Sequence, residues 1–240
     1  MEKLLITGWF LISVIFCMES FAQNPNERLA IDFDTLSYIR KYSRTDKYIM
    51  NLDENIRIEG SMYLDDDFKL GELILIDDSH KGGAFYRYNV YSNEMEIIEV
   101  KDTLAIISPE RIKYLKFNDG TFVFAKFKNK KEINRGYFEL LSNGNFRLLL
   151  RRIAIFEPYN PPYTALHSGT EYDRFIILKS YYFQKNGNPA IKIRKNKHYV
   201  LSIFNDKRKE LKKYIKQNKL KLHKDTDLIN LINYYNRLTY

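Results

Sequence analysis

Apolar and polar residues alternate along most of the chain between residues 56 and 195, which is the pattern of half-buried strands. The clearest case runs from Gly136 to Phe156, where two arms rich in aromatic and branched residues flank the Asn143-Gly144 pair. Because Asn-Gly tolerates the positive φ angles of a tight turn, this stretch predicts the central hairpin of an antiparallel sheet. Similar turn residues at 118–120 and 186–187 predict two further hairpins.

Short strands recur with turn residues between them and without a long helical pattern, which predicts an antiparallel meander. The meander occupies residues 56–195 and is either an open curved sheet or a partly closed barrel. From residue 196 to 240 the apolar period changes to three or four, which predicts one helix from Val200 to Asn218 and a second from Thr226 to Leu238. We therefore expect a mainly β, α+β fold whose C-terminal helical hairpin packs on the sheet.

The first 22 residues have the composition of a secretory leader. A short charged start precedes the apolar run Leu4–Cys17, and the segment 20–22 supplies small residues at a cleavage site. The run is too short to span a bilayer comfortably and has no basic flank after it, so a cleaved signal peptide is favoured over an uncleaved anchor. Residues 23–55 predict either a short helix or a loose N-terminal arm.

Export changes what the composition implies. The only cysteine, Cys17, and the only tryptophan, Trp9, lie in the leader, so the rest of the chain offers no disulfide, thiolate nucleophile or cysteine-bound metal. A net charge of +9 would suggest nucleic acid as the partner of an intracellular protein. For a protein of the periplasm or outer membrane, or a secreted one, no nucleic acid is expected. Anionic lipid headgroups or polyanionic glycans are the better candidates.

The sequence carries no catalytic or metal-binding motif. The four histidines are scattered, and the nucleophile elbow, the phosphate loop and the zinc-protease motif are missing, so we predict no catalytic residue, metal or cofactor. The carboxylates at Asp65–Asp67 and Asp77-Asp78 suggest calcium, but they lack the spacing and the glycine of a calcium loop. A solvated loop that ends a strand is favoured there.

The stretch from Glu157 to Arg174 has the composition of a contact loop. It carries three prolines, which pre-order the backbone, and the tyrosines Tyr159, Tyr163 and Tyr172, whose rings bind at little entropic cost. Long loops in compact domains are often functional. We predict that these three tyrosines bind a ligand or partner; the alternative is a rigid cover over a sheet edge or a barrel end.

A second candidate contact surface lies on the predicted strand at residues 85–91. Tyr86, Arg87 and Tyr88 follow one another there, and such a surface can stack a sugar or a nucleotide. The alternative is a strand whose tyrosines bury their rings and keep their hydroxyl groups in water.

The segment Lys207–Lys224 carries nine lysine and arginine residues among eighteen. An ordinary solvated helix face is the simplest explanation of such a run. The alternative is a peripheral contact with an anionic membrane surface through Lys209, Lys212, Lys213 and Lys216. We expect the lysines to be spread around the helix while its apolar face packs on the sheet.

Four segments together resemble exported proteins of unknown function from Gram-negative bacteria: Leu70–Asp77, Phe85–Ile97, Gly136–Arg152 and Phe204–Leu220. In those proteins a β-rich body follows a signal peptide, and a lysine-rich helix closes the chain. The resemblance is one of pattern and covers most of the chain after the leader. It implies a location in the cell envelope and brings no active-site residues with it.

Three functions are open on these grounds. The first is a non-enzymatic envelope protein that binds a protein, glycan or lipid, or that has a structural role. The second is a carrier whose curved sheet encloses a lipid or another hydrophobic ligand, with residues 157–174 as a lid. The third is a hydrolase that uses carboxylates such as Glu94, Glu96 and Glu99, of which Glu94 and Glu96 share one face of a strand.

Overall fold

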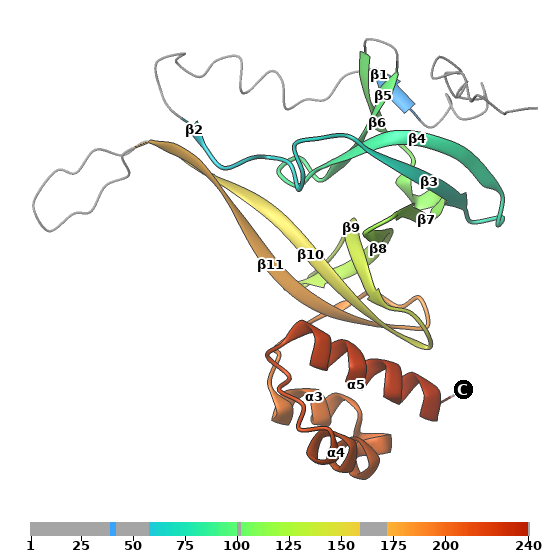
Figure 1. Ribbon diagram of the computed structural model, residues 1–240, viewed down its shortest axis with the longest axis vertical. Coiled ribbons are helices and arrows are strands. Elements are labelled where there is room, and N and C mark those ends of the chain that lie inside the picture. The colour runs from blue at the N-terminus through green and yellow to red at the C-terminus, as the bar shows by residue number, and fades with distance from the viewer. Residues whose placement is uncertain (1–38, 42–57, 100–101, 159–171, 240) are drawn as a thin grey trace, which may run out of the picture. The chain divides into compact units, whose positions relative to one another are not determined.

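The structure is a computed structural model that describes residues 39–41, 58–99, 102–158 and 172–239 (Figure 1). All of these residues belong to one compact unit, Ile31–Tyr240. The predicted leader at residues 1–22 lies outside the described residues, as does nearly all of the predicted arm or short helix at 23–55. Within that arm the structure describes one strand, β1, at Ile39–Lys41.

Twelve strands in the described part of the chain form one sheet with the order β1-β6-β5-β4-β3-β7-β8-β9-β10-β11-β12, and β2 pairs with β11. The strands after β1 are β2 (Ile58–Glu59), β3 (Lys69–Leu75), β4 (His80–Asn89), β5 (Glu94–Glu99), β6 (Asp102–Ile106), β7 (Ile112–Phe117), β8 (Gly120–Asn129), β9 (Glu132–Ser142), β10 (Phe146–Glu157), β11 (Asp173–Lys185) and β12 (Ile191–Ile193). Neighbours along this order are antiparallel, and the pairing of β2 with β11 is parallel. The predicted antiparallel meander is confirmed.

The three hairpins predicted from turn chemistry are present as β7–β8, β9–β10 and β11–β12. Asn186 and Gly187, between β11 and β12, have φ angles of +47° and +72°, the left-handed conformation for which Asn and Gly are suited. Gly144, between β9 and β10, has a φ angle of +151°. These local signals were sufficient to place the turns.

The open sheet curls so that β10 returns to the end of β4. Beyond Leu150 the strands β9 and β10 separate, after a bulge between Leu148 and Leu149. The backbone N–H of Ala154 on β10 instead donates to the carbonyl of Val90, which follows β4, over 3.0 Å. The eight strands β3 to β10 thereby contribute buried side chains to one apolar cluster, for example Leu73, Tyr88, Ile97, Leu104, Leu115, Phe122, Tyr137 and Ala154.

The turn between β4 and β5 helps to fill the gap between β9 and β10. The side-chain oxygen of Asn93 accepts hydrogen bonds from the Tyr88 hydroxyl (3.0 Å) and from the backbone N–H of Tyr137 (3.3 Å). Gly136 leaves room for this turn, since a Cβ atom there would lie 3.0 Å from the same oxygen.

A second closure lies at the other side of the sheet. An isolated parallel bridge joins Phe127 on β8 to Ala190, which lies between β11 and β12. Strands β8 to β11 surround a second cluster in which Phe127, Phe138 and Tyr182 make edge-to-face contacts, with ring centroids 5.2–5.6 Å apart. The open meander therefore has two locally closed regions.

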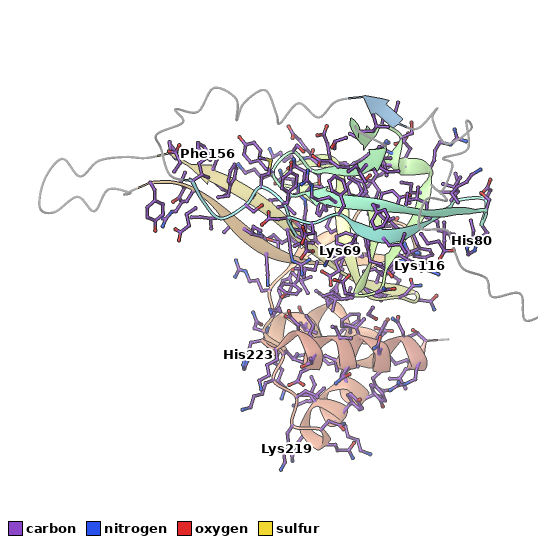
Figure 2. All side chains as sticks on the ribbon, turned by 45° about the horizontal axis from the view of Figure 1, so that its top comes forward. Lys69, His80, Lys116, Phe156, Lys219 and His223 are labelled. Atoms are coloured by element: carbon purple, nitrogen blue, oxygen red, sulfur yellow. The ribbon has the colours of Figure 1, made fainter. Side chains whose placement is uncertain are left out.

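The C-terminal module contains three helices: α3 (Lys197–Ile203), α4 (Arg208–Gln217) and α5 (Asp225–Leu238). The first predicted helix is interrupted at Phe204 and the 3-10 turn η2 (Asn205–Lys207), because the chain there turns the fully buried Phe204 ring against Phe146 of β10. Helix α5 packs against β9 and β10, and α4 packs mainly against α3 and α5 (Figure 1). Lys219, just past α4, points away from the sheet (Figure 2).

Helix α5 is attached to the β9–β10 turn by side-chain amides. The side chain of Asn236 accepts from the backbone N–H of Phe146 (3.0 Å) and donates to the Phe146 carbonyl (2.8 Å), as a neighbouring strand would. Its N–H also donates to the carbonyl of Asn143 at 3.3 Å. One turn earlier, Asn233 accepts from the Ser142 hydroxyl. The central hairpin is thus also the docking point of the helices.

Candidate functional site

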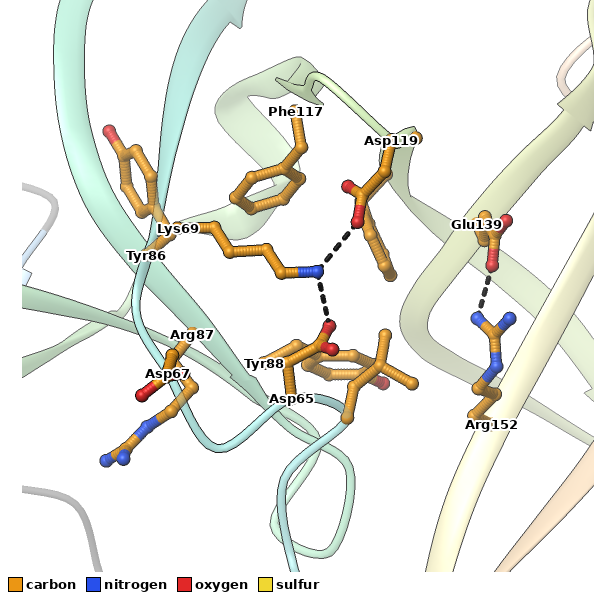
Figure 3. A pocket seen from close by; sticks show the side chains of 13 residues that line it. Asp65, Asp67, Lys69, Tyr86, Arg87, Tyr88, Phe117, Asp119, Glu139 and Arg152 are labelled. Atoms are coloured by element: carbon orange, nitrogen blue, oxygen red, sulfur yellow. Dashed lines mark hydrogen bonds and ion pairs between the residues drawn. The ribbon is translucent and has the colours of Figure 1, made fainter.

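A pocket of about 260 Å³ opens where the six strands β3, β4 and β7 to β10 meet the loop before β3 (Figure 3). Each of these strands contributes to the lining: Lys69 from β3, Tyr86 from β4, Phe117 from β7, Phe122 from β8, Glu139 from β9 and Arg152 from β10. Leu64, Asp65 and Asp67 of the loop complete the wall. Concave sites of this kind at the mouth of a curved sheet are where proteins commonly bind small ligands.

The floor of the pocket is aromatic. Tyr88 and Phe122 meet edge to face with their ring centroids 5.6 Å apart, and Phe117 contacts Phe122 at 5.8 Å and Tyr86 at 6.3 Å. Burial raises the pKa of the Tyr86 and Tyr88 hydroxyls well above the ordinary value, so both tyrosines stay neutral. The floor is therefore an uncharged aromatic surface whose rings pack edge to face.

Lys69 crosses the pocket above this floor. Its ammonium group donates to a carboxylate oxygen of Asp65 (2.9 Å) and of Asp119 (2.7 Å), and Figure 3 shows the side chain extended between the two acids. The hydrogen bond from Lys69 lowers the pKa of Asp119, and the hydrogen bonds to Asp119 and Asp65 raise that of Lys69. Both shifts favour the charged forms of Lys69 and Asp119 near neutral pH.

The lining carries one more negative than positive charge, with the carboxylates of Asp65, Asp67, Asp119 and Glu139 against the cations Lys69, Arg87 and Arg152. Arg152 of β10 pairs with Glu139 of the neighbouring strand β9. Lys69 pairs with Asp65 and Asp119, and Asp67 is a further carboxylate of the lining. An acidic pocket on a chain whose net charge is +9 favours a ligand with a positive charge.

Tyr86 and Tyr88, which we predicted as a stacking surface, line this pocket. Their exposed fractions are only 2% and 5%, so the rings are part of the core and leave little face free for a sugar. Their participation in ligand binding stays a prediction.

Arg87 lies between these tyrosines in sequence, but its guanidinium group turns away from the centre of the pocket (Figure 3). It is stacked between the rings of Tyr63 (3.6 Å) and Phe68 (4.3 Å) and bonds the buried carboxylate of Glu96 at 2.8 Å. Asn89 donates to the other oxygen of Glu96. This arrangement gives Arg87 a part in folding, and a role in binding stays a prediction.

The remaining predicted site residues lie elsewhere. Tyr159 and Tyr163 are outside the described residues, and Tyr172 is half-buried just before β11. The four predicted lysines are all exposed on α4, described below.

The acidic loops make local contacts. Asp66 accepts from Ser61, and Asp77 accepts from the hydroxyl and backbone N–H of Ser79. In the described ranges, no three His, Cys, Asp or Glu side chains are grouped so as to hold a metal ion. Asp119 was interpreted only as a turn residue, and Lys69 was not singled out.

Comparison of the chain with protein-family models, curated proteins and solved structures found no significant match. Within the part of the chain that the structure describes, no helix has the length and apolarity needed to cross a membrane.

Proposed function

We propose that the protein is a non-enzymatic binding module of the cell envelope and that its pocket holds an ammonium group of the ligand. The observation that carries this proposal is the pocket itself, in which an aromatic floor lies beneath paired carboxylates bridged by Lys69. Carboxylates form short charge-assisted hydrogen bonds with ammonium groups. The location in the envelope rests on the predicted leader at residues 1–22.

The ammonium group of Lys69 marks the position that the ligand's ammonium group takes. The side chains of Lys69, Asp65 and Asp119 are 38%, 49% and 64% exposed, and ion pairs this accessible contribute only about 0–1 kcal/mol each. The lysine stem is flexible and can swing into solvent. Lys69 therefore acts as an internal competitor that a better-placed amine displaces.

The two other functions have less support. A lipid carrier needs a larger and more apolar cavity than about 260 Å³ lined by carboxylates. Among the carboxylates considered for a hydrolase, Glu96 is buried and bonded to Arg87 and Asn89, which leaves it no free oxygen for proton transfer.

Replacing Lys69 with alanine is expected to strengthen binding of a small amine. The variant Lys69→Ala keeps Asp65 and Asp119 and vacates the space of the lysine stem, so n-butylammonium should bind roughly tenfold more tightly than to the unmodified chain. Isothermal titration calorimetry measures both affinities, with n-butanol as the neutral ligand that should not bind. Lys113→Ala is the matched control, since Lys113 pairs with Asp78 outside the pocket lining. Equal affinities in all three proteins would refute the proposal.

Removing the carboxylates should have the opposite effect. Asp65→Asn and Asp119→Asn together, in the Lys69→Ala background, leave the aromatic floor in place and withdraw both charge-assisted hydrogen bonds. We expect n-butylammonium binding to fall below detection in the same titration. If n-butylammonium binds this variant as tightly as it binds Lys69→Ala, it binds at a surface other than the pocket.

The pKa of Asp119 offers an independent readout. Because the hydrogen bond from Lys69 lowers this pKa, it should rise in Lys69→Ala and fall again when n-butylammonium is added. Amine binding should accordingly persist at neutral pH and disappear as the pH falls through the carboxyl range, where the protonated acid no longer attracts a cation. NMR titration of the Asp119 carboxyl carbon measures each shift, and a pKa unchanged by the amine would contradict the assignment.

A further inference from the structure

The helix α4, Arg208–Gln217, presents a continuous lysine face. Lys209, Lys212, Lys213 and Lys216 follow the spacing i, i+3, i+4, i+7, which places them within an arc of about 100° around the helix axis. All four are exposed. The expectation that the lysines are spread around the helix therefore needs correction, because these four are gathered on one side.

This lysine face is directed away from the rest of the protein. The buried residues of α4 are Leu211 and Ile215, and they pack with α3 and α5 in the helical cluster. Helix α5 in turn contacts β9 and β10, so that α5 lies between α4 and the sheet (Figure 1). The lysine face is thus on the outer side of the C-terminal module.

The lysines of this face have no acidic partners within the described ranges. This contrasts with Lys69, Lys113 and Lys195, each of which is paired with an aspartate. Like charges three and four residues apart destabilise a helix, so the arrangement opposes the stability of α4. A surface that binds anions explains why four unpaired cations stand together.

We propose that the lysine face of α4 docks the protein on a bilayer that contains anionic phospholipids. The four ammonium groups lie along one side of a straight helix, which suits a flat layer of phosphate groups. No apolar residue lies within the lysine arc, so the contact is electrostatic and peripheral, without insertion into the hydrocarbon. This proposal is independent of the ligand pocket.

The test is co-sedimentation of the full chain with phosphatidylcholine vesicles that either contain or lack phosphatidylglycerol. The chain should bind the anionic vesicles at low ionic strength, release them at high ionic strength, and ignore the neutral ones. Changing Lys209, Lys212, Lys213 and Lys216 together to glutamate should weaken binding at least roughly a hundredfold, since each lysine near such a surface contributes about fivefold.

The β8–β9 hairpin provides a control with the same change in net charge. Lys126, Lys128, Lys130 and Lys131 are exposed on it, and their change to glutamate should leave most of the vesicle binding intact. Circular dichroism of both variants verifies that the helices are folded. Equal losses of vesicle binding in the two variants would show that net charge alone is responsible. Binding to heparin but not to vesicles would assign the lysine face to a polyanionic glycan. Either result overturns the proposal.

Discussion

Replacing Arg87 with methionine is expected to lower the free energy of unfolding by about 3–5 kcal/mol, because it leaves a buried carboxylate without its partner. The side chain of Glu96 is 1% exposed and that of Arg87 18%, and they are joined at 2.8 Å across β4 and β5. Arg87 also donates to the carbonyl of Asp66 at 3.1 Å, which ties the loop before β3 to the sheet. Urea denaturation measures the loss.

Two control variants test whether the loss of stability in Arg87→Met comes from the burial of the ion pair or from ion pairing as such. Arg174→Met removes an arginine from an ion pair with Glu157 in which both side chains are 40% exposed, and it should destabilise the protein far less than Arg87→Met does. Adding Glu96→Gln to Arg87→Met should restore part of the stability, since it removes the unpaired charge and keeps an acceptor for Asn89. If Arg87→Met costs no more than Arg174→Met, the pair does not stabilise the fold in this way.

The elements that sequence reasoning predicted correctly depend on local chemistry. The Asn-Gly turns at 143–144 and 186–187 were placed because those residues tolerate backbone angles that others resist. Strand β4 was predicted from its alternation, and the burial of Tyr86 and Tyr88 is the outcome that such a pattern normally indicates. The C-terminal change of period likewise revealed helices.

The pocket could not be predicted because it depends on the order of strands in the sheet. Lys69 and Asp119 are 50 residues apart, and they meet because β3 pairs with β7 as well as with its sequence neighbour β4. Nothing in a single sequence distinguishes this pairing from other antiparallel arrangements. The break at Phe204 was missed for a similar reason, since the pattern gives the apolar positions of a helix but not the direction of its axis.

The attachment of the helices also depends on residues far apart in the sequence, and the side-chain amide of Asn236 should contribute strongly to stability. Asn236→Ala is expected to lower the free energy of unfolding by about 2–5 kcal/mol, because it leaves the buried N–H and carbonyl of Phe146 without partners. Asn230→Ala, at an exposed position on the same helix, should change stability by no more than about 0.5 kcal/mol. Thermal and urea unfolding of the two variants measure the difference.

A double-mutant cycle with Gly144 tests whether Asn236 acts through the β9–β10 turn. A Cβ atom at Gly144 would lie 2.6 Å from the side-chain amide of Asn236, and the φ angle of +151° is itself unfavourable for alanine, so Gly144→Ala should destabilise the protein. In the Asn236→Ala background the clash is gone and the backbone strain remains, so the glycine substitution should cost less there. Strictly additive effects would mean that contact with Asn236 is not the reason why Gly144→Ala destabilises the protein.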